Sequence, residues 1–138
     1  MVTEAIPAET VPRPREYAGL FFIAMATLMY EILLTRIFSV TMWYHFAFVA
    51  ISVALFGMTL GALIVHYFPS RFRDEDVYRL LWRYSLLFAV SIPPCFLTQL
   101  SIPFSPHANL ADLWSVVATC TVISIPFVFS GIVVALFL

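Results

Sequence analysis

Four long apolar segments restrict this 138-residue chain to membrane-spanning folds. They cover about residues 17–42, 45–68, 84–102 and 113–138, and each approaches or exceeds the roughly 20 residues that a helix needs to cross a bilayer. Charged residues make up 11% of the chain, whereas soluble domains carry about 25%. The sequence therefore predicts an all-α, multi-pass membrane helix bundle of about four transmembrane helices.

The arginines predict how this bundle is oriented. Most of them flank the apolar segments, either before the first one or in the 69–83 linker: Arg13, Arg15, Arg71, Arg73, Arg79 and Arg83. The connections at 43–44 and 103–112 carry no Arg or Lys. The positive-inside rule therefore places the N-terminus and the linker in the cytoplasm. Residues 1–16 are polar and Pro-rich, and we expect a disordered tail there.

The linker contains a recognisable helix start. Asp74 is a candidate N-cap, and Glu75 and Asp76 would face the positive end of the helix dipole. This pattern is typical of a solvated entry to the third span. Docking of a lipid phosphate or a partner is the alternative.

Two charged residues interrupt the first span, in the stretch YEILLTR. Glu31 and Arg36 are five residues apart, so they point about 140° away from each other on a helix and are not a same-face pair. An ionisable group inside a membrane helix is a functional hypothesis by default. Glu31, Arg36 and His45, at the outer start of the second span, therefore form the candidate intramembrane polar site. A structural role in tying helices together is the equal alternative, and Arg36 can also snorkel outward.

Small residues recur along one face of the second span, at spacings of three and four. We call this set the small-residue face: Ala47, Ala50, Ala54, Gly57 and Gly61. Such faces allow two helix backbones to approach closely, and Gly57–Gly61 fits the GxxxG pattern. Sequential helices are usually neighbours, so a helix of the same chain is the favoured partner and a second copy the alternative.

The remaining reactive side chains match no familiar site. His45, His66 and His107 lack the spacing of a metal motif, and no metal or cofactor motif is present elsewhere. Cys95 and Cys120 are expected to be buried thiols. No catalytic motif occurs, and no basic cluster indicates nucleic acid. Pro93, Pro94 and Pro126 fall within predicted spans and should bend them.

The run from Tyr30 to Phe68, with the E-x4-R pattern and Trp43-Tyr44-His45-Phe46, resembles the membrane region of spermidine synthase-like integral membrane proteins. The stretch IPFVFSGIVVAL, Ile125 to Leu136, resembles another recurring piece of that family. The resemblance implies a transporter-like N-terminal membrane region in a bacterial inner membrane. It also implies an aminopropyltransferase-like domain of the Rossmann kind, and no nucleotide loop or catalytic motif for such a domain occurs in this sequence.

These observations predict a non-catalytic membrane module that anchors a polyamine-forming domain or handles its substrate. The chain ends in apolar sequence at Leu138, so we expect it to be truncated before that domain. The expected partners are the bilayer, a downstream or separate aminopropyltransferase-like domain, and other membrane subunits. A small transporter-like protein or an accessory subunit of a larger complex is the alternative function.

Overall fold

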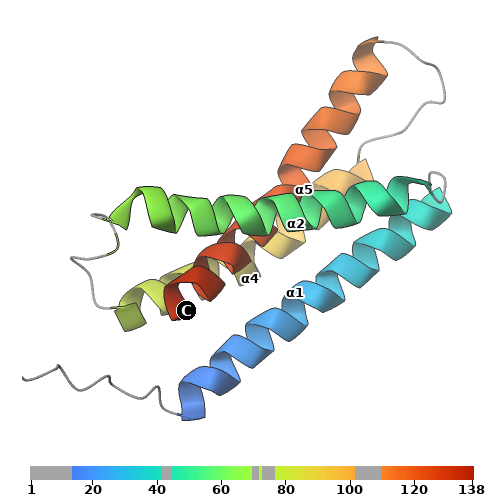
Figure 1. Ribbon diagram of the computed structural model, residues 1–138. Coiled ribbons are helices and arrows are strands. Elements are labelled where there is room, and N and C mark those ends of the chain that lie inside the picture. Colours follow the sequence, from blue (N-terminus) through green and yellow to red (C-terminus); the bar gives the residue numbers. More distant parts are fainter. Residues whose placement is uncertain (1–13, 42–44, 70–71, 73–76, 102–109) are drawn as a thin grey trace, which may run out of the picture.

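The computed structural model describes residues 14–41, 45–69, 72, 77–101 and 110–138, and four long helices account for nearly all of them (Figure 1). These helices are α1 (Pro14–Thr41), α2 (His45–Tyr67), α4 (Val77–Ser101) and α5 (Leu110–Phe137). Each is long and apolar enough to cross a membrane. The all-α, four-span class predicted from the sequence is therefore confirmed, and the chain is a multi-pass membrane protein.

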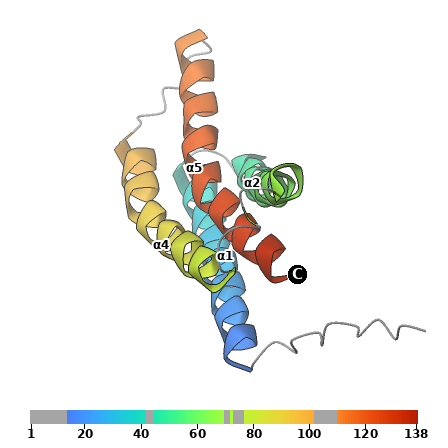
Figure 2. The same ribbon diagram turned by 90° about the vertical axis from the view of Figure 1, so that its left-hand side faces the viewer.

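Helix α5 is the centre of the bundle. It packs against all three other helices, most extensively against α2 and α4, while α1 packs mainly against α2. Figure 2 shows α5 lying between α4 and α2. The Tyr17 and Phe137 rings lie 5.5 Å apart, so α1 begins at the end of the bundle where α5 finishes. Helix α2 runs back towards the start of α1, so α2 and α5 run in the same direction (Figure 1).

Three helices begin before the predicted spans: α5 begins at Leu110, inside the predicted 103–112 connection, and α4 and α1 also begin early. Helix α4 begins at Val77, inside the predicted 69–83 linker, because its backbone continues beyond the apolar run into residues suited to the interface. Helix α1 begins at Pro14, inside the predicted tail, and proline is favoured at the first turn because its missing N–H is unpaired there anyway. The predicted cap at Asp74 lies outside the described residues.

The core is a stripe of large side chains facing two alanines. Tyr30, Leu34 and Phe38 follow one another at helical spacing on α1, and they pack with Ile123 and Phe127 of α5. Ala50 and Ala54 complete this cluster from α2. Because the alanines are small, the large side chains of α1 and α5 fill the space over α2.

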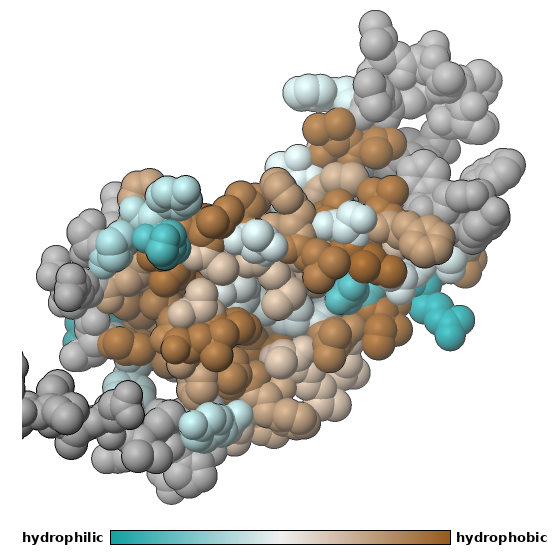
Figure 3. Space-filling model, viewed as in Figure 1, coloured by the Kyte–Doolittle hydropathy of each residue, from teal (hydrophilic) through white to brown (hydrophobic). Residues whose placement is uncertain are grey.

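Most of the outer surface is hydrophobic. Figure 3 shows hydrophobic side chains, in brown, over much of one face, with hydrophilic ones in isolated places. Bulky apolar residues such as Phe21, Leu28, Phe56 and Val90 are well exposed on the helices. In water such a surface would drive association, whereas lipid tails solvate it. The surface therefore agrees with residence in a bilayer.

Candidate functional site: the intramembrane polar residues

The structure describes the side chains of two of the three residues of the candidate polar site, and these two are not paired with each other. Glu31 is half-buried near the middle of α1, whereas Arg36 is exposed. Within the described part of the chain, neither side chain has a hydrogen-bond or ion-pair partner. His45 is the first residue of α2, and its side chain lies outside the described residues. The structure thus leaves Glu31 as the one carboxylate inside the described spans.

A buried hydroxyl pair links α1 to α5. Thr27 Oγ1 lies 2.6 Å from Ser130 Oγ and 2.8 Å from the Ile23 carbonyl oxygen. The single hydroxyl proton of Thr27 goes to that carbonyl, so Ser130 donates to Thr27. Both side chains are buried. Hydrogen bonds between membrane helices contribute about 0.6 kcal/mol on average, so this pair fixes the contact of α1 with α5 at modest energy.

Two other buried polar groups have no partner among the described residues. They are the hydroxyl of Tyr30, a residue 4% exposed, and Oε1 of Gln99, a residue 6% exposed. The Tyr30 ring packs against Phe127, with 5.4 Å between centroids. Gln99 follows Cys95 by one turn on the buried face of α4. An unpaired buried polar group costs about 1–3 kcal/mol, so both groups are candidate contacts for water or a small polar ligand.

The small-residue face of α2 packs against α5. A Cβ built at Gly57 would lie 2.8 Å from Phe127 Cβ and 2.9 Å from the Ser124 carbonyl oxygen. One at Gly61 would clash with the Val128 carbonyl oxygen. The partners are helices of the same chain: the glycines meet α5, while Ala50 and Ala54 share the core cluster with side chains of α1 and α5. The contact with α5 is close because α5 also has a glycine, Gly131, whose missing side chain admits the backbone of Met58.

The remaining candidates show no arrangement for catalysis or metal binding. Cys95 is buried and Cys120 half-buried, and both are free thiols. His66 is exposed near the end of α2 and contacts the Tyr67 ring, while His107 lies outside the described residues. Over the residues that the structure describes, no group of three His, Cys, Asp or Glu side chains could hold a metal ion.

Sequence reasoning missed the buried residues that carry polar groups: Thr27, Tyr30, Gln99, Thr119 and Ser130. A signal for two of them exists in the sequence, because Thr27 and Tyr30 precede Leu34 and Phe38 at spacings of three and four. That spacing places all four on one helix face. The sequence does not show that Ser130 of α5 meets this face, since the contact depends on how far α5 is shifted along α1.

Comparisons with known proteins give no relative for this chain. No family model, no curated protein and no solved structure matches it. The functional argument therefore rests on the residues and the geometry described above.

Proposed function

We propose that this chain is the non-catalytic membrane module of a spermidine synthase-like protein, and that it holds an aminopropyltransferase-like domain at a bacterial inner membrane. One observation carries the proposal. The two stretches that resemble that family, Tyr30–Phe68 and Ile125–Leu136, pack directly against each other through Gly57, Gly61 and Gly131. The resemblance therefore falls on two segments that form one helix contact, as expected if they belong to one membrane module.

The distribution of charge favours anchoring over polyamine handling. A polyamine carries several positive charges, and a site that passes it through a membrane needs carboxylates or water along its path. The described spans contain one carboxylate, Glu31, and their core is filled by fully buried Leu34 and Phe127. Spans of this composition suit a membrane anchor better than a pathway for a polyamine.

The coding sequence that follows Leu138, together with the neighbouring genes, gives the first test. We expect a Rossmann-type aminopropyltransferase domain in frame or in an adjacent gene. The second test assays transfer to putrescine in membrane and soluble fractions of cells that make the chain together with that domain. Activity should follow the membrane fraction, and the purified 138-residue chain alone should show none.

The matched variants are Gly61→Leu, which would force α2 from α5, and Gly19→Leu, whose position has open space around it. Only the first should lower the transfer activity recovered in the membrane fraction, because it disrupts the packing of the bundle. Transfer activity in the purified chain would overturn the proposal, as would a domain that binds membranes equally well without it.

A transporter is the second candidate, and the unpartnered Glu31 is the observation that favours it. An ionisable side chain within a span commonly belongs to an ion or substrate pathway. In that case Glu31→Gln should abolish uptake of labelled polyamine by cells at an unchanged protein level. Arg36→Gln is the matched control, because it removes the other charge from the same helix at an exposed position. Unchanged uptake in the Glu31 variant would remove the transporter reading.

A further inference from the structure

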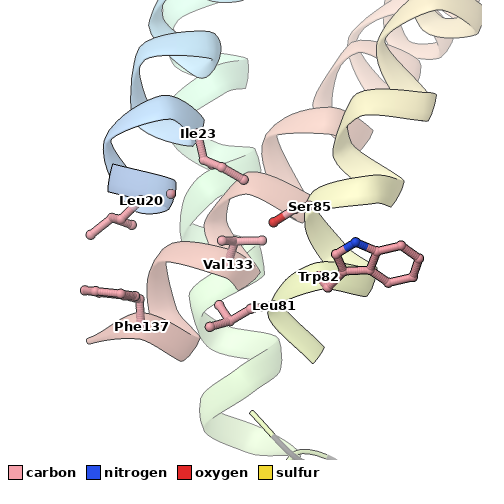
Figure 4. Close-up of a pocket in the computed structure, with 8 residues that line it drawn as sticks. Leu20, Ile23, Leu81, Trp82, Ser85, Val133 and Phe137 are labelled. Carbon is pink, nitrogen blue, oxygen red and sulfur yellow. The ribbon is translucent and has the colours of Figure 1, made fainter. Parts of the chain in front are cut away.

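A groove opens between α1 and α4 at the end of the bundle where α5 finishes (Figure 4). Its volume is about 320 Å³, at the lower end of the roughly 300–1,000 Å³ of small-molecule sites. Apolar side chains from three helices line it, among them Ile23, Leu81, Val133 and Phe137. The groove therefore suits an apolar chain lying within the bilayer.

Gly19 keeps this groove open. It lies on α1 beside the groove, and a Cβ built there would meet no atom within 4 Å. At the other glycines of the bundle, Gly57, Gly61 and Gly131, the added atom would strike α2 or α5. Gly19 therefore does not serve close packing of helices. Its missing side chain leaves space in the groove for a bound molecule.

A serine lines the groove, and an arginine lies beside it on α4. Figure 4 shows the Ser85 hydroxyl directed toward the space between the helices, and the Trp82 ring pointing outward from the rim. Arg79 is exposed and precedes Trp82 by three residues, so the two are neighbours on the surface of α4. Among the residues that the structure describes, Arg79 has no ion-pair partner. A guanidinium beside an interfacial tryptophan lies where lipid phosphates are found.

We propose that this groove binds one anionic phospholipid, with an acyl chain against Gly19, Ile23 and Val133 and the phosphate at Arg79. Basic pockets between membrane helices bind anionic headgroups in this manner. The two halves of the lipid match these features, because Trp82 lines the apolar groove and Arg79 is its neighbour on the surface of α4. The proposal does not depend on the chain's role as an anchor.

Native mass spectrometry of the full chain tests it. The protein is delipidated in mild detergent and mixed with equal amounts of dioleoyl phosphatidylglycerol and dioleoyl phosphatidylcholine. We expect retention of one phosphatidylglycerol per chain in preference to phosphatidylcholine. Arg79→Gln should weaken phosphatidylglycerol binding about fivefold, which corresponds to the roughly 1 kcal/mol of one basic residue near an anionic lipid surface.

Arg83→Gln is the matched control for charge. Around α4, Arg83 lies about 100° from Trp82 and about 160° from Ser85, whereas Arg79 lies about 60° and about 120° from them, so Arg83 is the more distant of the two arginines from the groove. Its substitution should leave lipid retention unchanged. Gly19→Phe fills the acyl part of the groove without meeting other atoms at its Cβ, so it should reduce retention of both lipids while the bundle stays folded.

Three results would overturn the proposal. They are equal retention of the two lipids by the unmodified chain, unchanged retention in Gly19→Phe, and equal losses in Arg79→Gln and Arg83→Gln. The third result would show attraction to a charged helix end without a site. Because Arg79 is exposed, its variant tests the headgroup contact even if Gly19→Phe fails to fold.

Discussion

Replacing Gly61 with alanine is the sharpest perturbation of this bundle. The substitution adds one carbon to α2 where the helix touches the backbone of α5. The new Cβ would lie 2.8 Å from Ile132 N and 2.9 Å from the Gly131 carbonyl carbon, and it would clash with the Val128 carbonyl oxygen. All three neighbours are backbone atoms, so no side chain can rotate out of the way.

The loss of stability in Gly61→Ala can be estimated from these distances. Ordinary contact begins near 3.4 Å, so α5 must move by at least 0.6 Å at Ile132. Overpacking a helix contact costs about 1–3 kcal/mol, and a contact with rigid backbone lies at the upper end. Alanine also gains about 1 kcal/mol over glycine in helix propensity. Gly61→Ala should therefore destabilise the protein by about 2 kcal/mol.

Gly19→Ala is the matched control, because the same substitution on α1 meets no atom within 4 Å. Its propensity gain is the same, so the difference between the two variants isolates the steric cost, about 3 kcal/mol. Unfolding by added sodium dodecyl sulfate in mild detergent, followed by helical circular dichroism, measures both free energies of unfolding. If the Gly61 variant is as stable as the Gly19 variant, the reasoning that backbone contact joins α2 to α5 is refuted.

The buried polar side chains give two further predictions. A double-mutant cycle of Thr27→Val and Ser130→Ala should show a coupling energy of about 0.6 kcal/mol and at most about 1.7 kcal/mol, because the two hydroxyls share one hydrogen bond. Thr98→Val, which removes an exposed hydroxyl bonded within α4, should not couple to Ser130, and equal coupling in both cycles would contradict the assignment. Tyr30→Phe should leave the free energy of unfolding unchanged or raise it by up to about 1 kcal/mol, since it removes an unpaired buried hydroxyl. A clear loss of stability in the same assay would show that the hydroxyl has a bound partner.

The sequence predicted the class of fold because the bilayer constrains a chain so strongly. With no water to pair with backbone groups, each apolar segment of this length has to be a helix. Hydropathy does not locate the ends of those helices, however. The charged and aromatic residues from Val77 to Arg83 form part of α4, since a helix can continue through the interface at no cost in backbone hydrogen bonds.

The arrangement of the helices was harder to predict than their number. The small-residue face indicated a close contact for α2, yet the short connection favoured α1 as its partner. The structure shows that α2 packs with α1 but makes its closest contact with α5, because Gly131 removes the side chain that would block Met58. Such a contact requires small residues at matching positions on both helices. The pattern within one span does not show which other span has small residues at those positions. The Thr27–Ser130 pair escaped prediction for the same reason.

Glu31 illustrates how packing limits what an intramembrane charge can do. Its neighbour Tyr30 is 4% exposed and belongs to the core, so Glu31 lies at the edge of the α1 contact. Arg36 is exposed and points about 140° away around the helix, so the two charges do not compensate each other. A pathway for a polyamine would have to lead from Glu31 through the bundle, where Leu34, Ile123 and Phe127 fill the interior. Because these apolar side chains fill that interior, a role for Glu31 at the outer face of α1, against another membrane helix, agrees with the packing better than a role in transport.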